Sequence, residues 1–342
     1  MVELSTSPVV NRLLHRLGKC LQVETTFSNV LTRVIDLNVG SDRYGSSSVF
    51  HRRLLGLHHV LCGARGEMIF YPGLHLPSDA KHFRRAFLSV NTLRRRKTSI
   101  DCGEWIMDSG AFTEISTYGF YRETPQEYAN EITRLLGLDD GLKAVVSQDW
   151  MCEPFILRKT GLTVEDHQRL TIERYDELHD LIRDVYLMPV LQGYCAYDYL
   201  AHLDGYGDRL TDGMWVGVGS VCKRNTNIYV IELILTAIRT ERPDLRLHGF
   251  GLKTTALQSS RISGWLWSAD SMAWSYAARK QGRNQNDWRE AMGFTRMIEG
   301  KTSATSQEAA FEEVELEEIR RYLGPEWKRP EPFRSGTFVR RL

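Results

Sequence analysis

Short apolar runs that each end in a polar or glycine-rich corner recur through the middle of this sequence. The clearest spans residues 104–112, where an apolar stretch leads to Asp108 and then directly into small residues. Such a run is typical of a buried strand, and the small residues let the backbone turn tightly beside the carboxylate. A single Asp-Ser-Gly would simply cap a turn, but the pattern recurs, which indicates one shared site. The other runs are Val145–Asp149, Met188–Gly193, Trp215–Ser220 and Trp265–Asp270.

Helical patterns alternate with these runs. Thr124–Glu127 forms a capping box with proline at the first helical position, and Thr163–Asp166 begins the next helix. Regular β-α alternation predicts a parallel sheet with crossover helices. Because the polar strand ends are spread over most of the repeat, we expect an α/β protein with a TIM (β/α)8-type barrel, not an open doubly wound sheet.

The expected barrel is one of three segments of the chain. We place it at residues 67–300, as the catalytic domain. A helix-and-loop addition is expected over residues 1–66, where apolar residues recur at helical spacing before a Gly/Ser-rich tract. Residues 301–342 are expected to form an acidic helix followed by a basic tail.

Composition is typical of a packed globular protein. The 342 residues are 42% hydrophobic and 25% charged. No apolar run approaches the roughly 18 residues that a membrane helix needs, and the N-terminus lacks the basic start and apolar core of a signal peptide. We therefore expect a cytoplasmic protein without membrane contact. The expected compartment is the cytoplasm of a bacterial host, and a phage origin of the chain is left open. The 6 cysteines include no C-x-x-C pair, which argues against a disulfide framework or a thiolate zinc site.

Positive charge gathers just before the Asp108 run, although the formal net charge of the chain is only +1. Asp79 is the only acid among residues 77–97. A local excess of cations favours a phosphate-bearing substrate, and an ordinary solvated surface is the alternative. The cations are Lys81, Arg84, Arg85, Arg94, Arg95, Arg96 and Lys97.

Carboxylates dominate the reactive side chains of this sequence. It contains no GxGxxG between a strand and a helix, no P-loop, no GxSxG elbow and no histidine pair at the spacing of a helical metal site. Two acids on facing strands suit a double displacement at a sugar carbon, in which one acts as nucleophile and the other handles protons. On this chemistry alone, a glycosidase fits as well as a glycosyl transferase.

Six motifs, taken in order, resemble the tRNA-guanine transglycosylase superfamily over roughly residues 67–290. They are Asp108–Phe112, Asp149–Pro154, Val190–Gly193, Val218–Val221, His248–Gly251 and Ala269–Ser271. Residues 147–154, 215–225 and 270–275 are similar to the DNA-acting branch, the DpdA family, whose members exchange guanine in DNA for a 7-deazaguanine such as preQ0. The resemblance implies DNA and a free 7-deazaguanine base as partners, and an ATP-dependent protein that opens the duplex is a further candidate.

The resemblance also assigns the catalytic roles. Asp270 would attack the sugar C1′, expel guanine and form a covalent nucleotide intermediate. Asp108 would act as the general acid and base that manages the proton on the departing and incoming bases. The alternative for Asp270 is a helix cap ahead of Ser271.

Recognition of the base is assigned to groups that only a guanine-like edge would satisfy. Asp149 would accept hydrogen bonds from N1–H and the 2-amino group. Phe112 and His248 would sandwich the ring by stacking, and an ordinary polar contact is the alternative for His248. The residues expected to donate to O6 or to line the same pocket are Gln192, Gly193, Gly219 and Ser220.

The sequence departs from the RNA-acting family at its zinc site. That family carries a Cys-x-Cys-x-x-Cys cluster and a His after the nucleophile, whereas no cysteine follows Cys222 here. We therefore expect no structural zinc and no other cofactor. A base in duplex DNA must be extruded before C1′ can be attacked, which calls for a basic groove. The candidates for phosphate contacts are Arg94, Arg95, Arg96, Lys97, Lys223, Arg224 and Arg283.

Three other functions stay open. Action on tRNA is the alternative within the superfamily, and it would yield a modified ribonucleoside instead of a deoxynucleoside. A base-releasing glycosidase would form free guanine without consuming a deazaguanine. A catalytically idle nucleic-acid-binding relative is the third, and the presence of both Asp108 and Asp270 argues against it.

Overall fold

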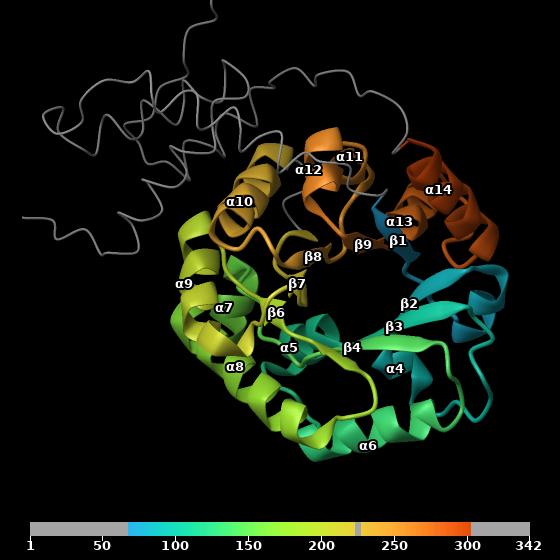
Figure 1. Ribbon diagram of the computed structural model, residues 1–342. Helices are drawn as coiled ribbons and strands as arrows, with labels where there is room; N and C mark the ends of the chain where they lie inside the picture. The colour runs from blue at the N-terminus through green and yellow to red at the C-terminus, as the bar shows by residue number, and fades with distance from the viewer. Residues whose placement is uncertain (1–67, 223–226, 302–342) are drawn as a thin grey trace, which may run out of the picture.

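The computed structural model describes residues 68–222 and 227–301. These residues form an α/β structure with strands near the centre and helices around them (Figure 1). The predicted additions at the two ends lie outside the described residues, apart from Lys301, as do the candidate phosphate contacts Lys223 and Arg224. None of the helices in the described segments is long and apolar enough to cross a bilayer.

The strands form two sheets, and every strand pair in the described residues is parallel, which confirms the predicted parallel arrangement. In residues 68–222 and 227–301, the strand pairings form two separate sheets and do not close into a barrel. The five-stranded sheet has the order β1 (Ile69–Pro72), β9 (Ser268–Ser271), β8 (Arg246–Gly249), β7 (Trp215–Val218) and β6 (Val190–Leu191). The four-stranded sheet has the order β2 (Arg85–Ser89), β3 (Glu104–Asp108), β4 (Leu142–Val146) and β5 (Tyr186–Met188).

The two sheets meet at two places. Pro189 alone separates β5 from β6, and its carbonyl accepts a hydrogen bond of 2.8 Å from the N–H of Gly217. At the other junction Gly73, just after β1, forms a parallel bridge with Phe87 of β2. The N–H of Leu74 also donates to the Phe87 carbonyl at 3.2 Å. The terminal strands of the two sheets are therefore neighbours at both junctions.

Helices connect most successive strands, as the alternation predicts; the exceptions in the described residues are β1 and β2, joined by a 3-10 turn, and β5 and β6, separated by Pro189. The capping boxes at Thr124 and Thr163 are confirmed: each threonine side chain accepts the N–H three residues later, and the acid at that position accepts the threonine N–H. The helices are α4 (Val90–Leu93), α5 (Ala111–Tyr118), α6 (Pro125–Leu136), α7 (Pro154–Thr160), α8 (Val164–Leu181), α9 (Ala196–Tyr206), α10 (Ile228–Glu241), α11 (Thr254–Leu257), α12 (Ser260–Trp265), α13 (Ala273–Lys280) and α14 (Trp288–Lys301), with 3-10 turns η1 (Pro77–His82) and η2 (Gly207–Arg209).

Alternation along the strands divides the buried side chains between two faces. Met107 and Ala269 belong to the large cluster that packs against the helices. A smaller cluster lies on the opposite face and draws on strands of both sheets; it consists of Tyr71, Phe87, Ile106, Ala144, Val146, Met188 and Val190. Because neighbouring residues of a strand point to opposite faces, Asp108 and Asp270 lie on the face of this smaller inner cluster.

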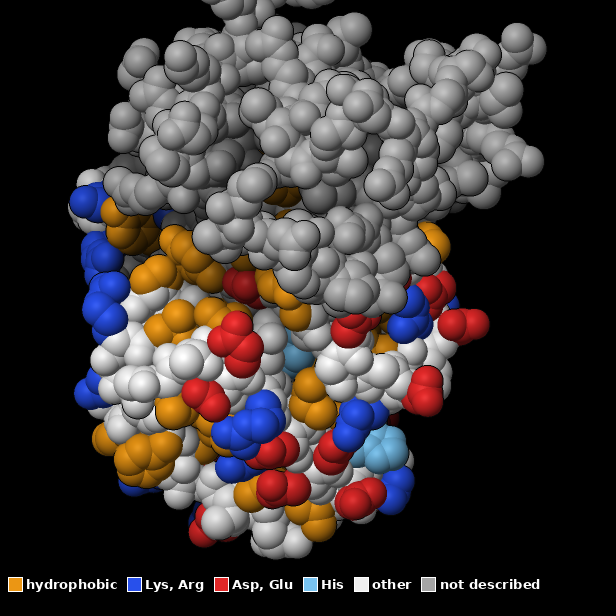
Figure 2. Space-filling view, turned by 90° about the vertical axis from the view of Figure 1, so that its left-hand side faces the viewer, with side chains coloured by type: hydrophobic (Ala, Val, Ile, Leu, Met, Phe, Trp, Pro, Cys, Tyr) orange, Lys and Arg blue, Asp and Glu red, His pale blue; other side chains and the backbone are white. Residues whose placement is uncertain are grey.

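The outer side of the molecule that carries α7 to α10 has interleaved acidic and basic side chains (Figure 2). On α8, Arg169 pairs with Glu173 at 2.8 Å. Arg209 of η2 pairs with Asp176 of α8, and its two nitrogens lie 2.6 and 2.8 Å from the carboxylate oxygens. These pairs balance the charges of Arg169 and Arg209 locally.

Candidate active site

Three carboxylates meet at the carboxyl ends of the strands. Asp108 is the last residue of β3, Asp149 follows β4 after a short turn, and Asp270 is the third residue of β9. The charge of Asp270 contributes to the raised pKa of Asp108, and the charge of Asp108 contributes to the raised pKa of Asp149. The three acids therefore lie within electrostatic range of one another in turn, Asp270 to Asp108 and Asp108 to Asp149, although β9 belongs to a different sheet from β3 and β4.

Asp108 has a pKa suited to proton transfer. Burial raises its pKa to about 6, and the nearby charge of Asp270 adds to the effect. The N–H of Gly110, which donates to Oδ2 at 3.1 Å, acts in the opposite direction. A carboxyl group with a pKa close to neutral pH exists in both protonation states, so it can give a proton in one step and take one in the next.

Asp149 is buried and has an even higher pKa. Burial raises the pKa to about 7, with smaller contributions from the charges of Asp108 and Glu153, while the hydrogen bond donated by the Gln192 side chain to Oδ2 lowers it. Glu153 is itself buried, at 2% exposure. The site thus concentrates acids in a water-poor environment, which makes each charge costly unless a ligand supplies donors.

Asp149→Asn is expected to stabilise the free protein by about 4 kcal/mol at pH 8 and by less than about 1 kcal/mol near pH 4. The folded-state pKa of about 7 lies above the ordinary value of 3.8, so the stability contributed by the protonated form is complete below pH 3.8 and is lost as pH rises through 7. Asparagine mimics the protonated form at every pH. Urea unfolding at both pH values measures the difference, with Asp208→Asn on the exposed η2 turn as control. Equal stability of wild type and Asp149→Asn at pH 8 would contradict the raised pKa.

Tyr121 positions the backbone of Asp149. Its hydroxyl accepts the Asp149 N–H and donates to the Asp149 carbonyl, both at 3.0 Å. The same oxygen lies 3.3 Å from Oγ of Ser109, the residue after Asp108. One buried side chain therefore links the segment after β3 to the segment after β4. No local sequence pattern marks Tyr121 as part of the site.

Gln192 is fully buried, and its side chain is already bonded within the protein. Oε1 lies 2.7 Å from Oγ of Ser220, and Nε2 donates to Asp149. Two side chains from the helices bind its backbone. The Gln192 N–H donates to Nδ1 of His202 at 2.8 Å, and the Gln192 carbonyl accepts from Nε2 of Gln168 at 2.7 Å. Gln168 on α8 and His202 on α9 therefore support the strand end that carries Gln192.

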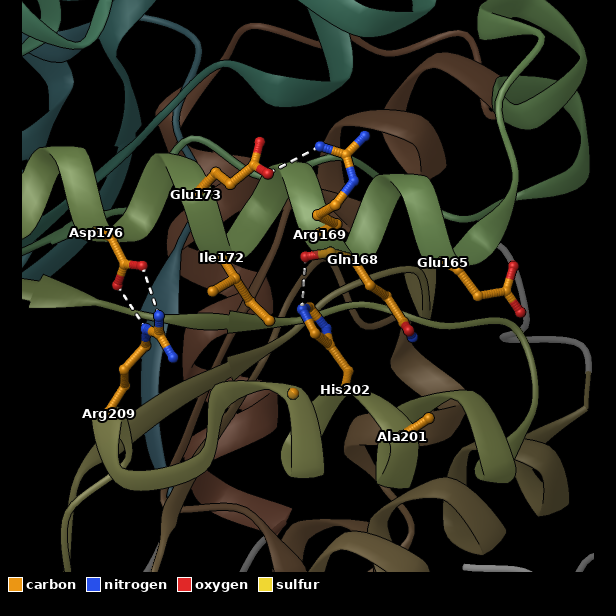
Figure 3. Close-up of a pocket in the computed structure, with 10 residues that line it drawn as sticks. Glu165, Gln168, Arg169, Ile172, Glu173, Asp176, Ala201, His202 and Arg209 are labelled. Atoms are coloured by element: carbon orange, nitrogen blue, oxygen red, sulfur yellow. Dashed lines mark hydrogen bonds and ion pairs between the residues drawn. The ribbon is translucent and has the colours of Figure 1, made fainter. Parts of the chain in front are cut away.

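Gln168 and His202 also line a cavity of about 360 Å³ between α8 and α9 (Figure 3). Burial lowers the pKa of His202 to about 3, so its ring is uncharged at neutral pH. Because Nδ1 accepts the Gln192 N–H, Nε2 carries the proton and donates to the Gln168 carbonyl at 3.1 Å. This cavity lies behind the strand end, on the helix side, and is separate from the carboxylate site.

Gly219 and Gly193 provide space at the site. A Cβ on Gly219 would lie 2.2 Å from Nε2 of Gln192, and a Cβ on Gly193 would lie 2.7 Å from Cβ of Asp198. The N–H of Gly219 donates to the Leu191 carbonyl at 2.9 Å. The expected role of this N–H as a donor to O6 is therefore wrong, because it is used within the sheet.

Ser220 adopts an unusual backbone conformation beside Gln192. Its φ is 54°, in the left-handed region that few residues other than glycine adopt. Its hydroxyl oxygen accepts the N–H of Cys152 at 2.8 Å and lies 2.9 Å from Oε2 of Glu153. These contacts hold the turn after β7 against the segment after β4, and such strained positions are frequent at functional sites.

His248 does not face a base. It is fully buried, and Phe87 stacks on its ring with centroids 5.6 Å apart and planes inclined by 15°. Its Nε2 lies 3.3 Å from Oδ1 of Asp270. The expected stacking on a base is wrong for His248, because an aromatic side chain already covers its ring. The polar contact that was the alternative is present, and its partner is the expected nucleophile.

Phe112 lies at the rim of the site. It is the second residue of α5, is 46% exposed, and contacts Phe155 of α7 edge-to-face with centroids 6.3 Å apart. The structure therefore does not pair Phe112 with the buried His248 in a sandwich. Phe112 follows Asp108 by four residues and Phe155 follows Asp149 by six, so this ring contact joins the segments after the two acids.

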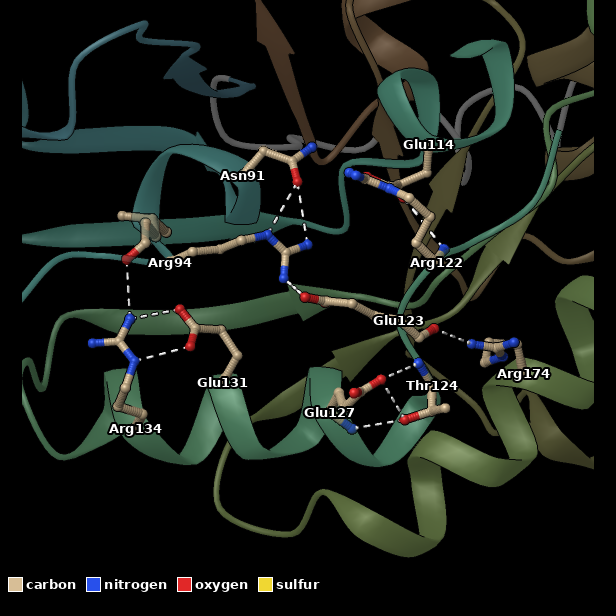
Figure 4. Close-up of polar contacts among 11 residues, drawn as sticks. Asn91, Arg94, Glu114, Arg122, Glu123, Thr124, Glu127, Glu131, Arg134 and Arg174 are labelled. Carbon is tan, nitrogen blue, oxygen red and sulfur yellow. Dashed lines mark hydrogen bonds and ion pairs between the residues drawn. The ribbon is translucent and has the colours of Figure 1, made fainter. Parts of the chain in front are cut away.

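Several of the cations expected to contact phosphate have partners within the protein. Arg94 pairs with Glu123 and also donates to Oδ1 of Asn91 (Figure 4). Arg96 donates to backbone carbonyls, and Arg283 pairs with Glu290 at 2.5 and 2.9 Å. For Arg94, Arg96 and Arg283, a phosphate contact would require these partners to be given up. The exposed members of the set in the described residues are Arg95, Lys97 and Arg283, and Arg283 is the one of these three that pairs with an acid.

A comparison with protein families identifies the chain. The model of the family DpdA, described as DeoxyPurine in DNA protein A, matches residues 67–286. This segment contains every strand described above and all three carboxylates of the site. A search of curated proteins finds no match. Because the family match covers more than half of the 342 residues, the chain belongs to the DpdA family of DNA 7-deazaguanine transglycosylases.

Proposed function

We propose that this protein exchanges guanine in DNA for a 7-deazaguanine base such as preQ0, by double displacement through a covalent intermediate on Asp270. The observation that carries the proposal is the meeting of Asp270 with Asp108, an acid whose pKa is about 6, at one edge of the strands. Family membership supports DNA as the polymer and a 7-deazaguanine as the incoming base.

We also infer that the two sheets are halves of one (β/α)8 barrel. Three observations support this inference. β5 and β6 are separated by one residue and continue each other, β1 and β2 touch through the Gly73–Phe87 bridge, and the inner cluster takes side chains from both sheets. In such a barrel the carboxyl ends of all strands surround one mouth, which is where barrel enzymes carry their active sites.

The chemistry follows from the roles of the two acids. In the first displacement Asp270 attacks C1′, the bond from C1′ to the guanine nitrogen breaks, and Asp108 donates its proton to the departing purine. In the second, the incoming base returns a ring N–H proton to Asp108 and attacks C1′, which releases the Asp270 carboxylate. Asp108 ends as it began, so exchange needs no other proton donor.

Asp149 and Gln192 are suited to reading the guanine edge. An ionised Asp149 accepts from N1–H and the 2-amino group, and these donors repay the cost of its buried charge. Gln192 gives one amide proton to Asp149 and has a second one to offer O6. A purine without the 2-amino group would leave Asp149 short of a donor, which is the kind of loss that discriminates strongly between bases.

Exchange is tested with DNA that carries labelled guanine, incubated with preQ0 and related 7-deazaguanines. We expect release of labelled guanine to match the appearance of a modified deoxynucleoside in mass spectra of the digested DNA. A deazapurine without the 2-amino group serves as the control and should react about 10²-fold more slowly or worse. Modification of tRNA alone would refute the choice of DNA, and guanine release without a deazaguanine would indicate a glycosidase.

The requirement for other factors is tested in the same assay. If a separate ATP-dependent protein opens the duplex, the isolated enzyme should prefer single-stranded DNA, since an unpaired base needs no extrusion. In the described residues no group of three or more His, Cys, Asp or Glu side chains is placed to hold a metal ion. Independence from zinc stays a prediction, which activity in the presence of a chelator would support.

A further inference from the structure

Two donors hold the same oxygen of Asp270. The N–H of Gly251 donates to Oδ1 at 2.9 Å, and Nε2 of His248 lies 3.3 Å from that atom. In residues 68–222 and 227–301, no hydrogen bond reaches Oδ2 of Asp270. The carboxylate is therefore anchored through one oxygen, and the other is left for chemistry.

The position of the His248 proton follows from a chain of buried groups. The indole N–H of Trp215 can only donate, and it reaches Oγ of Ser268 at 2.7 Å. That oxygen lies 2.8 Å from Nδ1 of His248. Ser268 is fully buried, so its own proton needs an acceptor, and Nδ1 is the one at hand. With Nδ1 accepting, the ring proton sits on Nε2, where it faces Asp270.

Aromatic side chains fix the orientation of the His248 ring. Phe87 stacks on it, Phe250 meets it edge-on with centroids 4.8 Å apart, and Trp215 meets it edge-on at 6.0 Å. The ring therefore cannot turn its Nε2–H away from Asp270 without disrupting the packing of the inner cluster. Nothing in this arrangement leaves His248 accessible to a base.

We propose that His248 is a positioning residue for base exchange, which orients Asp270 so that Oδ2 attacks C1′ while Oδ1 stays bound. The inference rests on the proposed function. When the bond from Oδ2 to C1′ forms and the bond to guanine breaks, Oδ1 becomes the carbonyl oxygen of the ester and still accepts from His248 and Gly251. When the incoming base attacks, the bond from Oδ2 to C1′ breaks and its electron pair returns to the carboxylate, where the two donors stabilise the charge.

Three substitutions of His248, which differ in where they place a hydrogen-bond donor, test this role. The amide nitrogen of His248→Gln reaches the position of Nε2, whereas the side chain of His248→Asn reaches only that of Nδ1, and His248→Phe keeps the packing without any donor. We expect single-turnover guanine release to fall about 10²-fold in the Asn and Phe variants, and by less than about tenfold in the Gln variant. The KM values for DNA and for the incoming base should change less than about threefold, since His248 touches neither.

A second variant keeps the test decisive if the His248 variants unfold. Ser268→Ala retains the imidazole and its aromatic neighbours but removes the group that directs the proton to Nε2, and it should release guanine about tenfold more slowly. Its melting temperature should fall, because the indole N–H of Trp215 loses its acceptor, but the variant should stay folded at the assay temperature. Equal losses in the Gln and Asn variants, or a wild-type rate in His248→Phe or Ser268→Ala, would overturn the positioning role. If the wild-type protein exchanges no base at all, the proposed function fails first, and the positioning role fails with it.

Discussion

Asp270→Asn is expected to lower the rate of base exchange by about 10³-fold or more, because an amide cannot form the ester with C1′. The fold should persist, since the asparagine carbonyl can still accept from the N–H of Gly251, which now donates to Oδ1 of Asp270 at 2.9 Å. Single-turnover release of labelled guanine measures the rate, and a denaturing gel measures the protein–DNA adduct. The adduct should be present in wild type and missing in the variant.

Asp208→Asn, on the exposed η2 turn, is the matched control for this loss of one carboxylate. It should form the adduct at the wild-type rate. A residual rate in Asp270→Asn within tenfold of wild type would place the nucleophile elsewhere, and an adduct that survives in this variant would have the same consequence.

Asp108→Asn is expected to slow guanine release by about 10²- to 10⁴-fold, the usual contribution of a general acid. It should also change the pH profile. Release needs Asp108 protonated, with a pKa of about 6, and Asp149 ionised, with a pKa of about 7. The wild-type rate should therefore be level between pH 6 and 7 and should fall about tenfold per unit on either side.

The two limbs of this profile belong to different residues, which gives the experiment an internal control. In Asp108→Asn the decline above pH 7 should disappear, because no acid is left to ionise, while the decline below pH 6 should persist through Asp149. Single-turnover rates at subsaturating DNA between pH 5 and 9 measure both limbs, because they report the pKa values of the free enzyme. A variant that keeps the alkaline decline would assign the proton to another group.

Local patterns in the sequence predicted the elements that depend on neighbouring residues. Both capping boxes are present because their donors and acceptors lie within one helical turn. The apolar run within residues 104–112 predicts a strand that leads to Asp108, and β3 runs from Glu104 to Asp108, because the apolar residues that form it are contiguous. The position of Asp270 at the end of a strand was predicted as well, although β9 begins at Ser268 and not at Trp265, which ends α12.

Features that depend on side chains from distant segments were predicted poorly. His248 was interpreted as a stacking residue, yet it alternates with Leu247 of the large cluster and therefore points into the inner face. Period-two alternation along β8 was the signal that could have found this. A helix begins at Ala111 directly after Gly110, whose φ is 77°, and this helix carries Phe112 to the rim.

No pattern in the sequence predicts which residues hydrogen-bond to the backbone of Gln192. Gln168 and His202 lie on two different helices and reach the backbone of Gln192 only once α8 and α9 have packed behind its strand. The ion pair of Arg94 with Glu123 cannot be predicted from local sequence either. The cluster of positive charge does not indicate which acid will pack against it. Contacts of this kind follow from tertiary packing and not from spacing along the chain.

The order of the strands has a consequence for how the protein is made. β9, which carries Asp270, lies between β8 and β1, so one of its two neighbours is the first strand of the described fold. A ribosome-bound chain that ends before residue 268 contains Asp108 and Asp149 but lacks Asp270, because β9 is the last strand of the described residues in chain order. On the proposed function, such an unfinished chain could not form the covalent intermediate.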